Sequence, residues 1–305
     1  MAERIKVRVP GSTSNLGSGF DTISAALGIY LDISAEVVPE GELVWPDGFN
    51  LPPEENMILQ ALEAACSHLG VKRPGLRFGI TNEIPLKRGL GSSAAAIIGG
   101  IKLAEGLSGK SLSRDAVFEI AYPLENHPDN LAASCLGGWA LSLVSDGRMR
   151  AESLESKLNV NYVVVIPEYT VSTREAREIL PGSYSLGDAV YNLQRVALMV
   201  HAVREGRSDL LRESSGDRLH QEFRASLVPG MSQILQQEFS ERFYSDGLLS
   251  ITVSGSGSAV LALVEDDGNP EAVGREISET FGANGIEARW RVLELDRAGA
   301  RYESL

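Results

Sequence analysis

The residues whose types and spacing best suit chemistry lie in one glycine-rich segment, which reads Pro85-Leu86-Lys87-Arg88-Gly89-Leu90-Gly91-Ser92-Ser93-Ala94-Ala95. A short apolar run precedes this segment, and an Ala/Ile-rich run with helical character follows it. Glycine lets the backbone approach an anion closely, and the first amides of a helix, which lack partners within the helix, favour negative charge. We therefore expect a loop that binds an anion. Ser92 or Ser93 is expected to cap the helix, and Lys87 and Arg88 add positive charge.

Two shorter patterns suggest other nucleotide sites, but their surroundings do not fit. Residues 106–111 are similar to a Walker A loop, yet Ala104 stands where the motif needs glycine and a helix end precedes it. Residues 89–94 match the dinucleotide pattern G-x-G-x-x-A, but the acidic ribose ligand expected about 20 positions on would fall in a segment that looks helical. A nicotinamide-dependent dehydrogenase stays an alternative, which titration with the cofactor would test.

The composition excludes several classes of partner. A formal net charge of −13 over 305 residues argues against general affinity for nucleic acid or an anionic membrane, because electrostatics supply most non-specific binding. Cys66 and Cys135 are too few for a disulfide framework, which indicates a reducing compartment. The first ten residues lack the apolar run of a signal peptide, and no run approaches the ~18 apolar residues of a membrane span. We expect a cytoplasmic protein.

The hydrophobic pattern predicts an alternation of strands and helices, in one large or two closely packed domains. Polar loops are expected over residues 10–21 and 40–53. The predicted helices cover residues 56–69, 94–107, 115–124, 188–204, 210–223 and 270–281. The predicted strands cover residues 4–9, 30–38, 76–80, 132–144, 162–166, 250–253, 259–264 and 287–295, with a hairpin turn at Asp146-Gly147.

Five motifs, taken in order, resemble the GHMP kinases. Residues 10–21, 85–96 and 253–261 are similar to the three glycine-serine motifs that any member of the family carries. Residues 125–130 (Glu-Asn-His-Pro-Asp-Asn) and 172–177 (Ser-Thr-Arg-Glu-Ala-Arg) are similar to the branch that phosphorylates L-homoserine. The resemblance runs through nearly the whole chain. Two small departures, Ser256 in the third motif and Leu131-Ala132-Ala133 after Asn130, remove no proposed ligand.

The resemblance implies an α+β GHMP kinase fold and a reaction. Residues 1–157 would form the N-terminal ATP-binding domain, similar to the second domain of ribosomal protein S5, and residues 158–305 a ferredoxin-like C-terminal domain. The activity it implies is transfer of the γ-phosphate of ATP, with Mg²⁺, to the hydroxyl of L-homoserine, which gives O-phospho-L-homoserine for threonine biosynthesis. A homodimer is implied as well.

The family's nucleotide site falls on the glycine-rich segment. Its residues 85–95 would hold ATP, and Asn56 stands where the family contacts adenine, although a plain helix N-cap would look the same. Ser92 or Ser93, together with Glu125, would hold Mg²⁺, a hard cation that prefers oxygen ligands. The sequence does not decide which serine is the ligand. Lys87 and Arg88 would neutralise the triphosphate, or else be solvated loop charges.

The family's substrate site falls on the other motifs. Arg174 and Arg224 resemble its carboxylate clamp, since a guanidinium fork binds a carboxylate with two hydrogen bonds. Asp21 would face the ammonium group of the amino acid. Polar side chains that would orient the substrate and its hydroxyl are Asn15, His127 and Asn130. Of all these residues, the resemblance makes four catalytic: Glu125, His127, Asn130 and Arg174.

A general base is the open point of the reaction. Asp129 could serve as one, but its side chain is better explained as a hydrogen-bond acceptor that forms a turn. The hydroxyl would then lose its proton late, to the phosphate or to solvent. Two alternatives to the whole interpretation are another GHMP kinase that acts on a small alcohol, and a non-catalytic ATP-binding sensor. The intact glycine-rich segment and Glu125 argue against the sensor.

Overall fold

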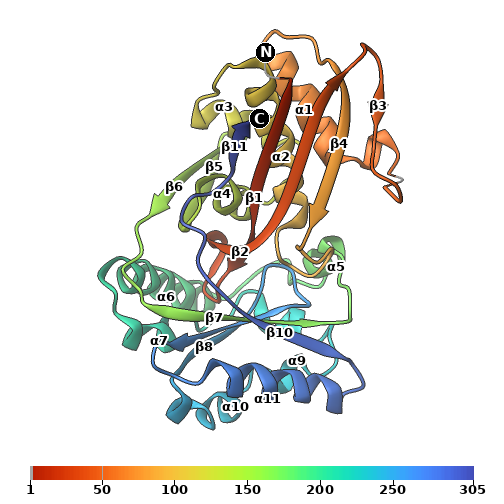
Figure 1. Cartoon of the computed structure of the whole chain (residues 1–305). Helices are drawn as coiled ribbons and strands as arrows, with labels where there is room; N and C mark the ends of the chain where they lie inside the picture. The colour runs from red at the N-terminus through yellow and green to blue at the C-terminus, as the bar shows by residue number, and fades with distance from the viewer. Residues whose placement is uncertain (1–2, 50) are drawn as a thin grey trace.

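The computed structural model describes residues 3–49 and 51–305, which form two β-sheets with helices packed on them (Figure 1). The first sheet has seven strands, with a main order β11-β1-β2-β4-β3, while β5 pairs with β2 and β6 with β5. The bounds of its strands are β1 Arg4–Asn15, β2 Gly19–Val38, β3 Leu43–Val44, β4 Gly75–Asn82, β5 Trp139–Ser145, β6 Arg148–Leu154 and β11 Arg301–Ser304. The second sheet has the order β10-β7-β9-β8, with β7 Val160–Pro167, β8 Leu248–Val253, β9 Val260–Glu265 and β10 Ala288–Leu293.

Helices α1 to α4 accompany the first sheet and the later ones the second (Figure 1). The first group is α1 Met57–His68, α2 Ser92–Ser108, α3 Arg114–Ala121 and α4 Pro128–Leu136. The second group is α5 Thr173–Glu178, α6 Leu186–Glu205, α7 Leu211–Ser214, α8 Gln221–Ala225, α9 Met231–Ile234, α10 Gln237–Glu241 and α11 Pro270–Ala283. Three single 3-10 turns, Pro53–Glu55, Ser208–Leu210 and Tyr244–Asp246, complete the elements.

Helix α2 is the centre of the first core. It is buried along most of its length, which explains its small and aliphatic composition. A Cβ atom on Gly100 would lie 2.3 Å from the carbonyl oxygen of Ile58 in α1, so only glycine permits this close helix packing. The packing holds α2 in a fixed position against α1.

The predicted elements are mostly confirmed, including the Asp146-Gly147 hairpin between β5 and β6. Asn56, Ser113 and Ser172 are the N-caps of α1, α3 and α5, and Ser172 forms a capping box with Glu175. The loop predicted over residues 10–21 is wrong for its first part, because β1 continues to Asn15. The polar residues of that part are buried in the strand, where their hydroxyls find partners on α4 and on the third motif.

Two further predictions are wrong. Residues 132–144 do not form one strand, because Pro128 starts helix α4 and Gly137, with φ of 72°, ends it before β5. Residues 210–223 do not form one helix. There the buried carboxylate of Asp217 accepts the backbone N–H of Leu219, His220 and Gln221, which bends the chain between α7 and α8.

The chain passes to the second sheet between β6 and β7 and returns at its end, where β11 pairs with β1. The sequence does not predict β11, which joins the first sheet although it follows β10. The division of the chain into domains at residue 157 stays a prediction. Strand β11 follows that residue in the sequence but belongs to the first sheet.

A buried hydrogen bond joins the two sheets. The indole Nε1 of Trp139, in β5, donates to the hydroxyl oxygen of Tyr162, in β7, at 2.8 Å. Trp139 is 0% and Tyr162 3% exposed, and burial raises the pKa of the Tyr162 hydroxyl to about 12. The bond therefore lies away from water, where a polar group without a partner is costly.

Tyr162→Phe is expected to lower the free energy of unfolding by about 1–3 kcal/mol, because the indole N–H would be buried without a partner. Urea unfolding measures the change. The control is Tyr302→Phe in β11, at a tyrosine that is 38% exposed, with an expected change within about 0.5 kcal/mol. Equal effects of the two substitutions would contradict the role of the bond.

Candidate functional site

Hydrogen bonds fix the glycine-rich loop on both sides. The Leu90 carbonyl accepts the N–H of Ser12, in β1, at 3.1 Å. On the other side the Gly89 carbonyl accepts the hydroxyl of Ser254, in the third motif, at 2.7 Å. A Cβ on Gly89 would lie 2.0 Å from the Ser254 carbonyl oxygen, and φ there is 72°. Glycine is therefore required where the two loops touch.

The loop ends in the N-terminus of α2. Gly91, with φ of 70°, is the N-cap, and no described side chain caps the helix. The expectation that Ser92 or Ser93 caps it is therefore wrong. The first bond that closes the helix is donated by Ala95 to the Gly91 carbonyl, so the amides before it are available to an anion.

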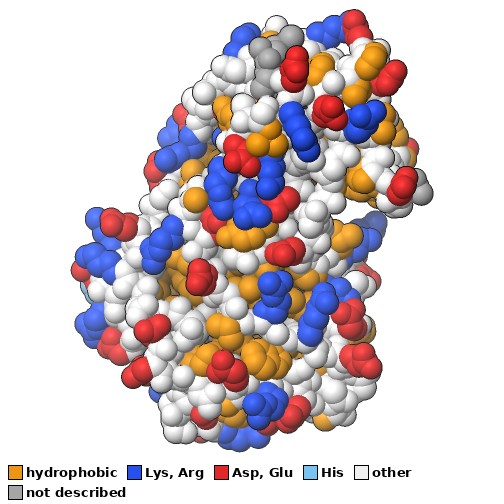
Figure 2. Space-filling view, in the orientation of Figure 1, with side chains coloured by type: hydrophobic (Ala, Val, Ile, Leu, Met, Phe, Trp, Pro, Cys, Tyr) orange, Lys and Arg blue, Asp and Glu red, His pale blue; other side chains and the backbone are white. Residues whose placement is uncertain are grey.

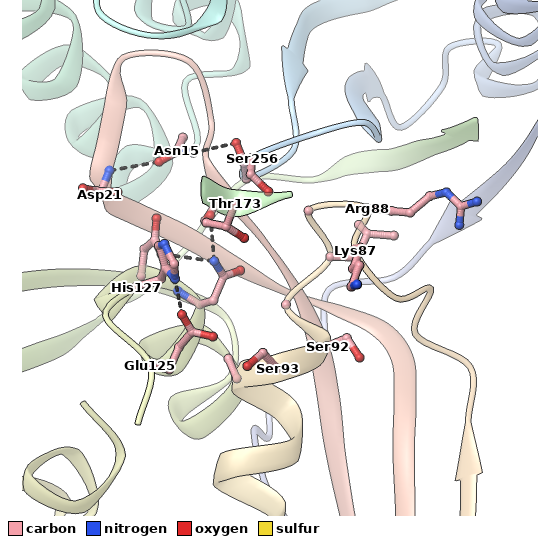
Figure 3. A pocket seen from close by; sticks show the side chains of 18 of the residues that line it. Asn15, Asp21, Lys87, Arg88, Ser92, Ser93, Glu125, His127, Thr173 and Ser256 are labelled. Carbon is pink, nitrogen blue, oxygen red and sulfur yellow. Dashed lines mark hydrogen bonds and ion pairs between the residues drawn. The ribbon is translucent and has the colours of Figure 1, made fainter. Parts of the chain in front are cut away.

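A cavity of about 150 Å³ lies over this helix end, between the two sheets (Figure 3). Its walls come from all five motifs, which supports the view that the motifs form one site. The lining residues are Ser14, Asn15, Asp21, Pro85, Lys87, Arg88, Gly89, Leu90, Gly91, Ser92, Ser93, Ala94, Glu125, His127, Asp129, Asn130, Thr173, Arg177, Arg224, Gly255 and Ser256.

Glu125 and His127 form an ion pair at one end of the cavity, where Oε1 of the carboxylate contacts Nδ1 of the imidazole. Burial is the largest single effect and disfavours both charges, but the mutual hydrogen bond and the attraction between opposite charges together outweigh it. The pKa of Glu125 is therefore lowered and that of His127 raised. The Ser93 hydroxyl faces Glu125 and also helps to lower its pKa (Figure 3).

The Glu125 carboxylate and the Ser93 hydroxyl are a pair of oxygen donors that fits Mg²⁺. A carboxylate and a hydroxyl are the hard ligands that Mg²⁺ accepts, and it commonly uses one or two carboxylates together with substrate phosphates. Among the described residues, no three His, Cys, Asp or Glu side chains are grouped so that they could hold a metal ion. Glu125 and Ser93 would thus share the ion with phosphate oxygens, and of the two predicted serines the structure favours Ser93.

Asp129 and Asn130, at the start of α4, form a buried network with β1. Oδ1 of Asp129 accepts the backbone N–H of Asn130 at 2.7 Å. The Asn130 amide accepts the Ser12 hydroxyl at 2.9 Å and donates to the Ser14 hydroxyl at 3.1 Å. Burial, and then the charge of Asp21, raise the pKa of Asp129 to about 6.

Asp21 and Arg177 form the second charged pair of the cavity. The guanidinium of Arg177, in α5, contacts both oxygens of Asp21, at 2.7 and 2.8 Å. Arg224, in α8, is 4% exposed and lies beside this pair. Its Nε donates to the Ala176 carbonyl at 3.2 Å and its terminal nitrogen to the Gly255 carbonyl at 2.9 Å, and burial lowers its pKa to about 10.

The structure does not bring Arg174 into the cavity. Its side chain is 85% exposed and pairs with Glu178, one turn along α5, at 2.7 Å. Thr173 and Arg177, which are also one turn apart, face the cavity instead. The structure therefore does not place Arg174 at the predicted clamp position, and Arg177 of the same helix is the arginine that faces the cavity. The i,i+4 pairing of Arg174 with Glu178 was a signal in the sequence that could have shown this.

Other predicted residues have structural partners. The amide of Asn15 closes its own loop, because Oδ1 accepts the Asp21 N–H and Nδ2 donates to the Gly255 carbonyl, both at 2.9 Å. Asn56 caps α1 through the Leu59 N–H at 3.1 Å and does not line the cavity. Leu86 is 63% exposed and Ala95 is buried in α2, so neither lines it.

Lys87 and Arg88, the two basic residues of the glycine-rich loop, differ in where their side chains lie. Arg88 pairs with Glu168 at 2.7 Å and donates to the Tyr169 carbonyl at 3.2 Å, so its side chain extends away from Glu125 (Figure 3). Arg88 therefore joins the glycine-rich loop to the end of β7. Lys87 is exposed at the mouth of the cavity and is the better placed of the two to meet a phosphate.

The outer surface carries mixed charge. On the face drawn in Figure 2, acidic and basic side chains are interspersed, with one group of basic side chains in the upper half. None of the helices in residues 3–49 and 51–305 is long and apolar enough to cross a membrane.

Comparisons with known proteins show the family of the chain. The models "GHMP kinases N terminal domain" and "GHMP kinases C terminal" match residues 56–138 and 199–283. A homoserine kinase of Persephonella marina is 39% identical over 305 residues, with 99% of each chain covered. Another, of Thermus thermophilus, is 39% identical over 280 residues, 92% of this chain and 93% of that one. The crystal structure of a homoserine kinase from Cytophaga hutchinsonii shares the fold, with a TM-score of 0.88 at 24% identity over 99% and 98% of the chains.

The family models and the relatives show that this two-sheet protein of mixed α and β structure is a kinase. The family resemblance and the α+β fold predicted from the sequence are confirmed. The chain belongs to the GHMP kinase family and, within it, to the homoserine kinases.

The raised pKa of Asp129 makes stability depend on pH. The folded protein holds the Asp129 proton up to a pH of about 6, against an ordinary pKa of 3.8, so ionising this carboxyl costs stability as the pH rises between these values. Asp129→Asn is therefore expected to stabilise the protein at pH 8 by up to about 3 kcal/mol, at about 1.4 kcal/mol per pKa unit, and hardly at pH 4. Urea unfolding at the two pH values measures the difference.

The matched control is Asp115→Asn, at an exposed carboxylate in the first turn of α3. Its effect on unfolding is expected to lie within about 0.5 kcal/mol at both pH values. If Asp129→Asn instead destabilises the protein, and more so at pH 8 than at pH 4, then the charged carboxylate stabilises the fold. That result would contradict this account.

Proposed function

We propose that this chain is an ATP-dependent phosphotransferase that transfers the γ-phosphate of ATP to the hydroxyl of L-homoserine, giving O-phospho-L-homoserine. One observation carries the proposal: a single cavity holds both a helix N-terminus open to an anion and a pair of opposite charges, Asp21 and Arg177. The first suits a triphosphate and the second suits the ammonium and carboxylate of an amino acid. The relatives are named homoserine kinase, which supports both a phosphate donor and an amino-acid acceptor.

The nucleotide half of the site needs positioning and charge neutralisation rather than covalent chemistry. The amides of residues 92–94 and the ammonium of Lys87 bind the phosphates of ATP. Glu125 and Ser93 would hold Mg²⁺, which would neutralise the charge that develops on the transferred phosphoryl group.

The substrate half of the site is complementary to a zwitterion. Asp21 and Arg177 contact each other at the wall of the cavity, and an amino acid that opens this pair would offer each of them the opposite charge. Arg224 reinforces the carboxylate end, since its two backbone hydrogen bonds fix the guanidinium. An alcohol that carries only a carboxylate would leave Asp21 without its partner, which disfavours such substrates.

The hydroxyl of the substrate would lie near His127 and Asn130, which orient it toward the γ-phosphate. His127 is held by Glu125, and Asn130 by the hydroxyls of Ser12 and Ser14. Asp129 accepts hydrogen bonds within this network, so we assign it a supporting role rather than that of a base. The proton leaves late, to the phosphate or to solvent.

We also propose that the protein is a cytoplasmic homodimer.

A coupled assay for ADP release tests the proposal directly. Turnover is expected with L-homoserine, ATP and Mg²⁺, and hardly at all without Mg²⁺, with O-phospho-L-homoserine identified by mass spectrometry. Preference for mevalonate or a sugar in a panel of alcohols would refute the assignment of substrate. Binding of ATP without turnover of any alcohol would favour the non-catalytic sensor.

Arg177→Ala is expected to raise the KM for homoserine by about 100-fold, because a charge-assisted hydrogen bond contributes about 1.5–3 kcal/mol and Asp21 would lose its partner. Steady-state kinetics measure the change. Arg174→Ala, three residues earlier in the same helix, is the matched control and should leave the KM within about twofold. The reverse order of the two effects would restore Arg174 as the clamp.

Glu125→Gln is expected to lower kcat at least about 100-fold, because removing one group that neutralises developing charge typically costs that much. Glu119→Gln, at an exposed position of α3, is the control and should leave kcat unchanged. Titration with Mg²⁺ should also show that Glu125→Gln needs more of the ion for half-maximal rate. An unchanged Mg²⁺ requirement would exclude Glu125 as a ligand.

A further inference from the structure

The ring of Phe20, at the start of β2, contacts three charged or polar side chains of the substrate half of the site. The guanidinium carbons of Arg177 and Arg224 lie 5.2 and 5.0 Å from its centroid. The imidazole of His220 stacks on it, with centroids 5.1 Å apart and planes inclined by 23°. One aromatic side chain thus touches both arginines of the clamp. Neither the motifs nor the reaction gives Phe20 a role.

These contacts leave the edges of the guanidiniums to other partners. Arg177 donates to Asp21, and Arg224 to two backbone carbonyls. A cation placed against the face of a ring is attracted by the ring's quadrupole, and the attraction grows when water is excluded. Arg224 is 4% exposed, so its contact with Phe20 lies in such a place.

His220 fixes the ring in turn. Its Nε2 donates to the Gly17 carbonyl, in the loop that carries Phe20, at 2.8 Å. Its backbone N–H donates to Asp217 at 2.9 Å. The imidazole is fully buried, and burial lowers its pKa, so a neutral ring stacks on Phe20 without repelling the two arginines. Loop, ring and helix α8 are therefore held as one unit.

We propose that Phe20 is a positioning residue: its ring aligns the guanidiniums of Arg177 and Arg224 so that both can bind the carboxylate of the amino-acid substrate. This rests on the proposed function, in which these arginines form the clamp. Asp21, the next residue, faces the ammonium group, so one short segment sets the positions of all three charged groups. The alternative is that Phe20 only fills space.

Kinetics with two acceptors separate positioning from packing. L-homoserine carries the carboxylate, whereas 3-aminopropan-1-ol has the same hydroxyl and ammonium groups without it. Phe20→Leu keeps an apolar side chain but removes the ring face. Because two cation–π contacts are lost, this substitution is expected to raise the KM for homoserine about tenfold. The kcat and the KM for ATP should stay within about twofold of the wild-type values. The preference for homoserine over 3-aminopropan-1-ol, as a ratio of kcat/KM, should fall about tenfold.

Two variants serve as controls. Phe20→Tyr keeps the ring and should keep the preference for homoserine. Tyr191→Leu removes another ring that carries two guanidiniums, those of Arg195 and Arg218, at 3.2 and 4.1 Å, outside the cavity described above. It should leave the kinetics with both acceptors unchanged. Thermal unfolding checks that each variant is folded, and Phe20→Met, of similar volume, replaces Phe20→Leu if the latter is not.

The outcomes are distinct. Equal losses with homoserine and 3-aminopropan-1-ol, or the same loss in Phe20→Tyr, would overturn the inference and leave Phe20 as a packing residue. A wild-type protein that does not phosphorylate homoserine at all would refute the proposed function instead. A fall in preference confined to the variants without a ring supports the inference.

Discussion

The site depends on the contact between the glycine-rich loop and its two neighbours, β1 and the third motif. Gly89 and Leu90 present their carbonyls to Ser254 and Ser12, and this leaves the amides at the start of α2 directed at the cavity. A Cβ on Gly89 would collide with the backbone of the third motif. Because β1 and the third motif belong to different sheets, an anion site at this point exists only when both sheets are assembled.

The same contact brings the charged groups together. The Gly255 carbonyl, in the third motif, accepts hydrogen bonds from Asn15 and from Arg224. Asn15 in turn fixes the Asp21 backbone. The segment that holds the nucleotide loop therefore also sets the distance between the substrate charges and the end of α2. Phosphoryl transfer needs this kind of positioning more than it needs a reactive side chain.

Sequence reasoning identified the motifs because glycine, serine and charged residues at fixed spacing have few structural explanations. It did not show which side chain of a motif points inward. Arg174 and Arg177 are three residues apart in one short helix. The spacing of Arg174 and Glu178 favours a surface pair, but the packing of α5 decides that Arg177 faces the cavity. Buried polar strand residues such as Thr13 look like a loop until their partner, Ser254, is placed across the sheet boundary. The bend at Asp217 was not predicted either, because its carboxylate accepts local backbone N–H groups in a segment whose pattern also fits a helix.

Hydrogen exchange tests the central claim most directly. The exchange rates of backbone amides would be compared with and without Mg²⁺ and a non-hydrolysable ATP analogue. The account predicts slower exchange in residues 92–94 on binding, because those amides would donate to phosphate oxygens. Unchanged rates there, with protection only in another segment such as 106–111, would contradict it.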